Sequence, residues 1–473
     1  MISSDLSPFP KLLFAAPDAL LPIALFVLFV SRSFLSEEKA KTIFPKFSLT
    51  MSFICLIVTL SHSTTWNNSS NSLFIYNASL SYIKSILMGC SIVAFAIMSI
   101  TSIWKMLPSY IYIFLFGIIN SIVLCLSANH FLLLLLGLEL YTFSICFLLM
   151  NSEKDDELQK GVARFLLASY SATAILLFGM SLYFSGSGSL SFPSINFDAD
   201  LTTTVATTLV ISALLFKMGV APFHSWMIDI YERSSFGLIV FFDAIWKFFI
   251  FFIFTRFFKI ILDAEYFQIQ IFIEVVSSLS MMIGAIMPIF QKNIKKFVAY
   301  ASIGHAGFVM SVFATVRDVS SLSNAALYII SYSFASICFF TIILKLSKYR
   351  PIVTFEDLCG LMKDSPRLGY CMLASMFAMT GIPPFINFTA KLQIFTMQLS
   401  NEHHVLLAIS LVFSILSVLY TGKVMINIFK PRSNSLKTPK SGIEVFLSFF
   451  AIVIAPFFYL LTDEWIKGLL RHI

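Results

Sequence analysis

Five ionisable side chains lie deep inside long apolar segments of the sequence: Glu139, Lys217, Lys247, His305 and Lys391. Placing one charged side chain at the centre of a bilayer costs about 2.5–3.5 kcal/mol on the insertion scale. The four charged groups together therefore cost on the order of 10 kcal/mol, as much as the whole stability of a typical domain. Such residues usually pair with one another or line a water-filled cavity. Their types and positions predict a chain of proton-exchanging groups that carries protons through the protein.

Two of the segments that carry these lysines are also interrupted by proline. Pro222 follows Lys217 by five residues, and Pro383 and Pro384 precede Lys391. A proline inside a helix removes the hydrogen bond to the carbonyl four residues back, and a lipid-exposed orphan carbonyl is costly. Broken helices at corresponding places in two halves of a chain are typical of inverted repeats with a site at their interface. We therefore expect both breaks to lie within protein, beside internal water.

The composition is that of a polytopic membrane protein. Hydrophobic residues make up 58% of the 473 residues and charged residues only 12%, against about 25% charged residues in soluble domains. With roughly 20 residues needed for each crossing, the sequence predicts an all-α fold of about fourteen transmembrane helices. The predicted spans are 12–30, 47–62, 82–103, 108–127, 129–150, 165–184, 203–226, 237–255, 268–290, 298–316, 322–344, 368–398, 405–429 and 443–460. The basic residues lie in loops at one face, so the net charge of +7 does not indicate nucleic-acid binding.

The distribution of basic residues predicts the orientation of these helices. If the N-terminus is outside, most lysines and arginines fall in the loops of the inner face, in agreement with the positive-inside rule. Lys84 is one of the few basic residues that this topology assigns to the outer face. Because the number of helices is even, both termini are expected on the outer, periplasmic side.

The two broken spans, the seventh and the twelfth, are five helices apart. Because five is odd, repeats of five helices would have opposite orientations. We therefore predict four parts. They are N-terminal helices 1–3 over residues 1–107, a first repeat of helices 4–8 over 108–262, a second, inverted repeat of helices 9–13 over 263–430, and a C-terminal helix over 431–473.

The sequence offers no recognisable site for a redox cofactor or a metal. Its seven cysteines are scattered, no pair is spaced C-x-x-C, and no cluster of histidine and cysteine has metal-ligand spacing. The segment Gly186-Ser-Gly188 is too short for a dinucleotide-binding motif. We therefore expect no cofactor in this chain.

A change in the distance between Glu139 and Lys217 would make this pair a switch. A nearby carboxylate favours the protonated lysine, whereas burial without a carboxylate favours release of the proton. The proton would then pass to Lys247 and, through internal water, to Lys391, which releases it outward. A structural alternative exists for each group, with the Glu–Lys pair as a bridge between helices and His305 as a hydrogen-bonded core residue.

Three other polar residues have simpler interpretations. Lys423 is near the inner end of its span, so its ammonium can reach the interface. Asp243 is one turn before Lys247 and could simply neutralise it. His224 lies near the inner interface beside Trp226, which suits an anchoring role.

Four sequence motifs resemble those of the antiporter-like subunits of respiratory complex I. They are GLELYTF with Glu139, LLFKMGVAPFHSWMIDIY with Lys217, VAYASIGHAGFVM with His305, and GLMKDSPRLGYCMLASMFAMTGIPPFINFTAKLQIF with Lys391. The similarity covers nearly the whole chain. The chain looks most like the subunit N family, because Lys391 stands where the M type typically has glutamate and the long C-terminal extension of the L type is missing.

This resemblance implies a multi-pass protein of the bacterial inner membrane with two inverted five-helix repeats. It implies proton translocation driven by quinone reduction elsewhere in NADH:quinone oxidoreductase, with Glu139 and Lys217 as the coupling pair. Lys247 would be the central relay and Lys391 the terminal site. FMN, iron–sulfur clusters and quinone would belong to partner subunits, and neighbouring antiporter-like subunits would be the membrane partners.

The sequence departs from the family pattern near the central lysine. The family often has proline just before this lysine, whereas this chain has Trp246, and Asp243 beside Lys247 is unusual. After Tyr231 the family usually has a small, proline-containing turn, whereas this chain has Glu232-Arg-Ser-Ser235. These departures concern the local geometry and the proton affinity around Lys247.

The sequence leaves three other functions open. A subunit of a multi-subunit Na⁺/H⁺ antiporter would share the fold and the motifs, and its neighbouring subunits would distinguish it. A self-contained solute transporter would need a pocket of mixed polar groups, whereas these ionisable residues form a single-file set. A purely structural membrane scaffold would leave the buried charges unexplained.

Overall fold

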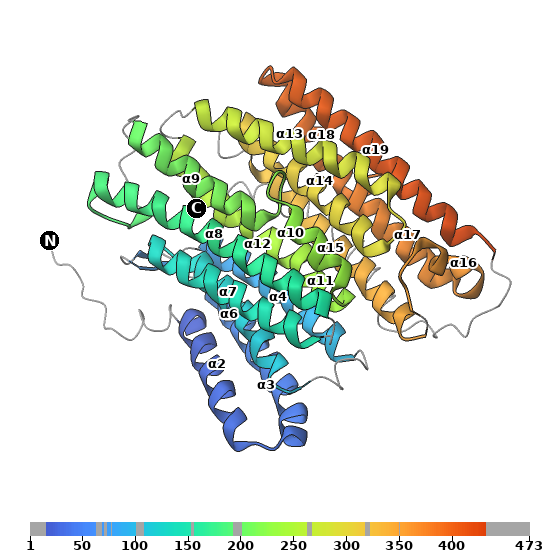
Figure 1. Ribbon diagram of the computed structural model, residues 1–473, viewed down its shortest axis with the longest axis horizontal. Coiled ribbons are helices and arrows are strands. Elements are labelled where there is room, and N and C mark those ends of the chain that lie inside the picture. Colours follow the sequence, from blue (N-terminus) through green and yellow to red (C-terminus); the bar gives the residue numbers. More distant parts are fainter. Residues whose placement is uncertain are drawn as a thin grey trace. The chain divides into compact units, whose positions relative to one another are not determined.

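The computed structural model describes residues 16–62, 69–70, 73–76, 78–100, 108–152, 156–192, 201–262, 267–316, 322–349 and 351–431. Nearly all of these residues are helical (Figure 1). Nine helices within these ranges are at least 18 residues long and apolar enough to cross a membrane. The prediction of an all-helical, multi-pass membrane protein is therefore confirmed. The predicted span 443–460 lies outside the described residues.

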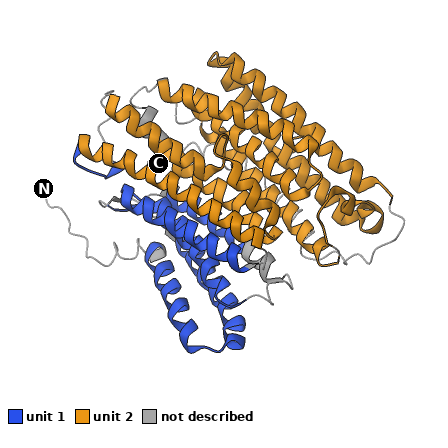
Figure 2. Ribbon diagram, viewed as in Figure 1, with its two compact units in different colours: residues 1–152, 187–196, 472–473 blue, residues 153–186, 197–471 orange. Residues whose placement is uncertain are grey.

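The chain divides into two compact units (Figure 2). The first unit contains residues 1–152 and 187–196. Its helices are α2 (Ala16–Phe34), α3 (Glu37–His62), α4 (Ala78–Ile100), α6 (Ile111–Ser127) and α7 (Phe131–Ser152). Two short antiparallel strands, β1 (Ser69–Ser70) and β2 (Ile75–Tyr76), lie between α3 and α4.

Helix α3 is longer than the sequence predicts, because it begins at Glu37 and not near residue 47. Two glutamates occupy its first turn, where negative charge is favoured by the helix dipole. The Glu37 carboxylate accepts hydrogen bonds from Arg32 at 2.5 Å and from the backbone N–H of Ser109 at 2.7 Å. A hydropathy pattern detects only the apolar part of such a helix and misses its polar first turns.

The second unit contains residues 153–186 and 197–471. Its long helices are α8 (Asp156–Ser187), α9 (Leu201–Met218), α12 (Lys247–Leu262), α13 (Phe267–Phe290), α14 (Ile294–Thr315), α15 (Leu322–Ser347), α17 (Pro366–Thr380), α18 (Ile386–Ser400) and α19 (His404–Phe429). Its short helices are α10 (Ser225–Arg233), α11 (Phe236–Val240), the π-helix η2 (Phe241–Trp246), the 3₁₀-helix η4 (Phe355–Leu358) and α16 (Leu361–Asp364). Residue Ser187, the last of α8, is assigned to the first unit.

The central helices of the second unit are almost entirely enclosed. Nearly every residue of Phe236–Phe257 is buried, as are most residues of α14 and α15, whereas α13 and α19 each have a larger exposed fraction. Small residues let α13 and α14 approach closely, because a Cβ added at Gly284 would lie 2.2 Å from the Cα of Gly304. Such small-residue contacts are typical of helix packing in membranes. Asp243, Lys247 and His305, which lie on these central helices, are therefore enclosed by protein.

Two helices of the second unit are interrupted at glycine and proline. The first interruption separates α9 from α10, beginning at Gly219 and including Pro222, and the second separates α17 from α18, beginning at Gly381. Gly219 has a φ of 74° and Gly381 a φ of 72°. These left-handed conformations suit glycine because it has no Cβ. Both interruptions lie at the segments where the sequence predicts them, with Pro383 and Pro384 in the second.

Candidate functional site

Lys217 is the next-to-last residue of α9 and is only 4% exposed. Its Nζ donates a hydrogen bond to the Ser169 Oγ of α8, at 2.7 Å. Its backbone carbonyl accepts a hydrogen bond from the Trp246 Nε1, also at 2.7 Å. Carbonyls in the last turn of a helix lack intrahelical donors, so the indole satisfies one that the end of α9 leaves open. Trp246, which departs from the family pattern, thus links the Lys217 region to the start of α12.

Lys247 is the first residue of α12 and is 2% exposed. Its Nζ donates a hydrogen bond to the Ser302 Oγ of α14, and the Ser302 hydroxyl donates in turn to Asp243 Oδ1. Asp243 is completely buried. Its carboxylate also accepts hydrogen bonds from Tyr332 Oη, at 3.2 Å to Oδ2, and from Ser336 Oγ. A serine hydroxyl therefore bridges the ammonium and the carboxylate.

A π-helical turn lies between Asp243 and Lys247, so their spacing in the sequence does not predict how their side chains face each other. The sequence places Asp243 four residues before Lys247, which on an α-helix would put the two side chains on one face. Residues Phe241–Trp246 instead form the π-helix η2, in which hydrogen bonds join residues five apart. A π-helical turn inside a longer helix is rare and is frequently found at functional sites.

His305 lies on α14, one turn after Ser302, and is 2% exposed. Its Nδ1 is 2.6 Å from the Tyr328 hydroxyl, and its Nε2 is 3.3 Å from the Tyr420 hydroxyl. The imidazole ring also packs against the Tyr332 ring, with 4.9 Å between their centroids. Both ring nitrogens therefore have hydroxyl partners, an arrangement that suits either neutral tautomer.

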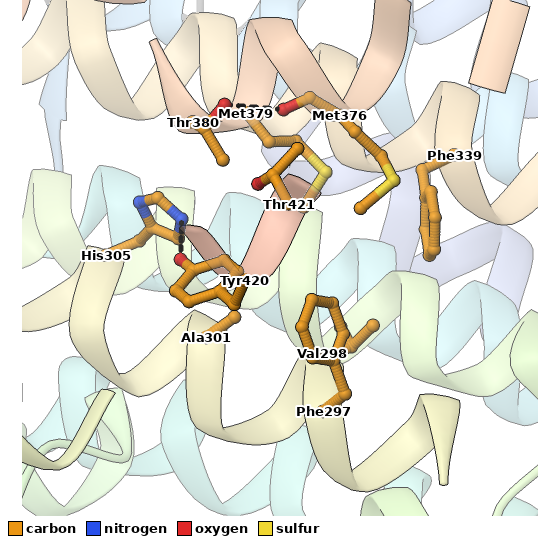
Figure 3. A pocket seen from close by; sticks show the side chains of 10 residues that line it. All are labelled: Phe297, Val298, Ala301, His305, Phe339, Met376, Met379, Thr380, Tyr420 and Thr421. Carbon is orange, nitrogen blue, oxygen red and sulfur yellow. Dashed lines mark hydrogen bonds between the residues drawn. The ribbon is translucent and has the colours of Figure 1, made fainter. Parts of the chain in front are cut away.

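A small cavity of about 20 Å³ adjoins His305 (Figure 3). Its wall is almost entirely apolar, although His305, Thr380, Tyr420 and Thr421 are among the residues that border it. Figure 3 shows His305 and Tyr420 at one side of the cavity, with Thr380 nearby. A space of this size holds about one water molecule when polar partners are available.

Lys391 lies on α18 and is 1% exposed. Its Nζ donates hydrogen bonds to the backbone carbonyl of Thr380, at 2.7 Å, and to Ser414 Oγ, at 3.3 Å. Thr380 ends α17, so the ammonium sits at the negative end of a helix dipole. The rings of Phe308 and Phe413 lie 5.7 and 5.4 Å from Nζ, within the range of cation–π contacts.

Glu139 lies on α7 and is half-buried. It belongs to the first unit, whereas Lys217 belongs to the second. The pairing of these two residues therefore stays a prediction.

One buried ion pair is missed by the sequence reasoning. Lys84, assigned above to the outer-face loops, instead lies on α4, and its Nζ is 3.1 Å from both carboxylate oxygens of Asp18 on α2. The Ser127 hydroxyl of α6 also donates to this carboxylate. The sequence reasoning counted Lys84 only as a basic residue of the outer side and did not predict that its charge is neutralised inside the first unit. The sequence does contain a hint of this pair, since Asp18 and Lys84 are charged residues of opposite sign near the start of two apolar spans.

The residues that replace the family's proline-containing turn hold α10 at the surface of the second unit. Glu232 pairs with Lys296 at 2.8 Å, and Arg233 lies 3.7 Å from Glu157. Such exposed pairs typically contribute less than about 1 kcal/mol each. These two pairs therefore contribute little to the stability of the second unit. Within the described ranges, no group of three histidine, cysteine or acidic residues could hold a metal ion.

Comparison with known proteins identifies the family. The family model described as "NADH:quinone oxidoreductase/Mrp antiporter, TM" matches residues 128–417, more than half of the chain. The chain belongs to this family of antiporter-like transmembrane subunits. It is similar to NADH-quinone oxidoreductase subunit N of Pelagibacter ubique, with 30% identity over 65% of this chain and 66% of the relative. The subunit N of Nitrosomonas europaea is 27% identical over 87% of each chain. These relatives confirm the predicted resemblance to subunit N, and with it the prediction of a translocase subunit of NADH:quinone oxidoreductase.

Solved structures share the fold. A chain of respiratory complex I from Thermus thermophilus matches with a TM-score of 0.78 and 20% identity, covering 96% of this chain and 98% of that one. A chain of the Mrp complex from Dietzia sp. matches with a TM-score of 0.85 and 16% identity, covering 97% of each. At such low identities these matches show the fold alone. The sequence relatives, and not the structural ones, favour the oxidoreductase over the Na⁺/H⁺ antiporter.

Proposed function

We propose that this chain carries protons across the bacterial inner membrane, driven by quinone reduction in other subunits of NADH:quinone oxidoreductase. In this proposal Glu139 and Lys217 form the coupling pair and Lys247 is the central relay. His305 connects the central relay to Lys391, the terminal site. Neighbouring antiporter-like subunits are the membrane partners, and FMN, iron–sulfur clusters and quinone belong to other subunits.

One shared feature of the three buried lysines carries this proposal. Each ammonium donates a hydrogen bond to a serine hydroxyl on another helix, and the three serines are Ser169, Ser302 and Ser414. A hydroxyl can accept a hydrogen bond from an ammonium and can donate one to a neutral amine. The lysines can therefore release a proton without leaving a buried nitrogen unpaired, which would cost about 1–3 kcal/mol.

The region between the central and the terminal lysines is lined with groups that exchange protons. Ser302 and His305 are one turn apart on α14, and His305 borders the cavity that Thr380 also lines. The Thr380 carbonyl accepts the hydrogen bond of Lys391. These contacts support His305 as a relay and not only as a packed core residue.

The two helix interruptions support an arrangement of two inverted repeats. The first reads Gly219-Val-Ala-Pro222 and the second Gly381-Ile-Pro-Pro384, and both glycines are left-handed. We assign the first repeat to residues 108–262, the second to 263–430, and N-terminal and C-terminal parts to 1–107 and 431–473. The fold would then have fourteen membrane helices with both termini on the periplasmic side. This orientation is tested by introducing a single cysteine near each terminus and labelling it with a thiol reagent that does not cross the membrane. Both cysteines should be labelled in intact cells as well as in opened cells.

The proposed function is tested by measuring protons moved per electron in the assembled complex, reconstituted into lipid vesicles. Lys217→Ala and Lys247→Ala should each lower this ratio while NADH oxidation by the peripheral subunits continues. Lys160→Ala is the matched control, because Lys160 is an exposed lysine that pairs with Glu157 at 2.8 Å on the surface of the second unit. A native gel checks that every variant assembles. Full proton stoichiometry in either buried-lysine variant would overturn the proposal.

A further inference from the structure

We propose that Asp243 is itself a proton-binding group of the central relay and receives the proton of Lys247 through the Ser302 hydroxyl. This inference rests on the proposed function, since it adds a proton acceptor to the same path. It differs from the simpler interpretation in which Asp243 is a fixed counter-ion of Lys247.

The bridging serine is the first observation in favour of this role. Ser302 Oγ accepts from the ammonium of Lys247 and donates to Oδ1 of Asp243, so the three groups form one continuous hydrogen-bonded line. All three residues are at most 2% exposed. Proton transfer requires such a continuous line, whereas a counter-ion needs only to lie near the ammonium.

The transfer along this line is balanced and needs no other reactant. An N–H bond of the Lys247 ammonium breaks as a new O–H bond forms at Ser302. The original Ser302 O–H bond breaks as an O–H bond forms at Asp243 Oδ1. The products are a neutral amine, an unchanged serine and a neutral carboxylic acid. The pair has zero net charge before and after, so the step moves no net charge into the apolar interior, where an unpaired ion is very costly.

The other partners of Asp243 suit both of its protonation states. Tyr332 and Ser336 donate from α15 to Oδ2, so three hydroxyl donors stabilise the carboxylate when Lys247 is charged. The same hydroxyls can rotate and accept a hydrogen bond when the acid is protonated. Tyr332 also packs against His305, the next proposed group of the path. When Lys247 is protonated and Asp243 is a carboxylate, the pair as a whole is neutral. The Asp243 carboxylate can then accept an arriving proton while Lys247 stays protonated.

Two serine variants separate a relay from a counter-ion. Ser302→Ala and Ser336→Ala each remove one hydroxyl donor to the Asp243 carboxylate, but only Ser302 also contacts Lys247. The relay predicts a larger loss of protons moved per electron in Ser302→Ala, which interrupts the line from Lys247, than in Ser336→Ala, which leaves the line intact, measured with the complex in lipid vesicles. Equal ratios in the two variants would overturn it.

Infrared difference spectra of the working complex give a second readout. A relay predicts a carbonyl stretch of a protonated carboxylic acid that appears during turnover, shifts in D₂O and is absent in Asp243→Asn. If no such band depends on Asp243, the residue stays a carboxylate and the inference is wrong. Lys247→Met is measured in parallel. Full pumping in Lys247→Met would refute the proposed function itself, whereas its loss together with equal serine variants would refute only the role of Asp243.

Discussion

Replacing Lys84 by methionine should strongly destabilise the first unit, because it removes one partner of a buried ion pair. The Lys84 ammonium lies 3.1 Å from both oxygens of Asp18, and the two side chains are only 5% and 4% exposed. In Lys84→Met the carboxylate keeps the Ser127 hydroxyl but loses its counter-charge. Breaking a buried pair in this way costs about 3–5 kcal/mol. At 1.4 kcal/mol for each tenfold step, this is roughly a 10²- to 10⁴-fold change in the ratio of folded to unfolded protein.

A double variant separates the charge pair from the packing of the side-chain methylenes. Asp18→Leu combined with Lys84→Met replaces both charges by apolar groups, a change that is often neutral or stabilising. The assay heats the purified complex in steps and measures, on a native gel, the fraction that retains this chain. The midpoint temperature should fall in each single variant and return close to the unmodified value in the double variant. If the fall in midpoint temperature of the double variant equals the sum of the falls in the two single variants, the charges do not act as a pair and the reasoning is refuted.

The remaining predictions concern the two helix interruptions. Trp246→Phe removes the hydrogen bond from the indole N–H to the Lys217 carbonyl. The loss of one hydrogen bond should destabilise the chain by about 0.5–1.5 kcal/mol, measured as a lower midpoint in the same heating assay. Trp226→Phe removes the same side-chain volume but should lower the midpoint less, because the Trp226 Nε1 has no hydrogen-bond partner in the described part of the chain. Gly381→Ala strains a left-handed residue by roughly 1–3 kcal/mol and places a Cβ 3.2 Å from the Lys391 Cδ, so protons moved per electron should fall. Gly188→Ala has similar backbone strain at a φ of 67° but no atom within 4 Å of its Cβ, and should leave that ratio unchanged.

Two outcomes would contradict these expectations. Equal stability losses in the two tryptophan variants would show that the indole hydrogen bond at the end of α9 contributes nothing. A normal proton ratio in Gly381→Ala, in a complex that assembles fully, would show that the position of Lys391 tolerates displacement.

The lysines and the helix interruptions could be predicted because both are local features of the sequence. A lysine within an apolar run and a proline beside it reveal their cost directly, whatever the rest of the chain does. The hydroxyl partners could not be predicted in this way. Ser169 is 48 residues from Lys217, and Ser302 is 55 residues from Lys247. Serines are common in membrane helices, so only the packing of α8 and α14 shows which of them meet a lysine.

Two other parts of the site depend on geometry that spacing does not reveal. Asp243 is four residues from Lys247, but the π-helical turn changes the facing direction that an α-helix would give. Lys84 lies near the start of an apolar span, and the count of basic residues assigns it only to the outer side. Its partner Asp18 is 66 residues away on another helix. In both cases the deciding contact comes from tertiary packing, which charge counting and periodicity do not include.

The most direct test of the central claim is the number of protons moved per electron when Lys391 is replaced by methionine. The control is Lys423→Met, because the Lys423 ammonium also donates to backbone carbonyls, those of Ile289 and Gln291, at 2.8 Å each, without belonging to the proposed path. Proton translocation through Lys391 predicts a lower ratio in Lys391→Met and the unmodified ratio in Lys423→Met, in complexes that assemble equally. The unmodified ratio in Lys391→Met would contradict the claim that this chain moves protons through its buried lysines.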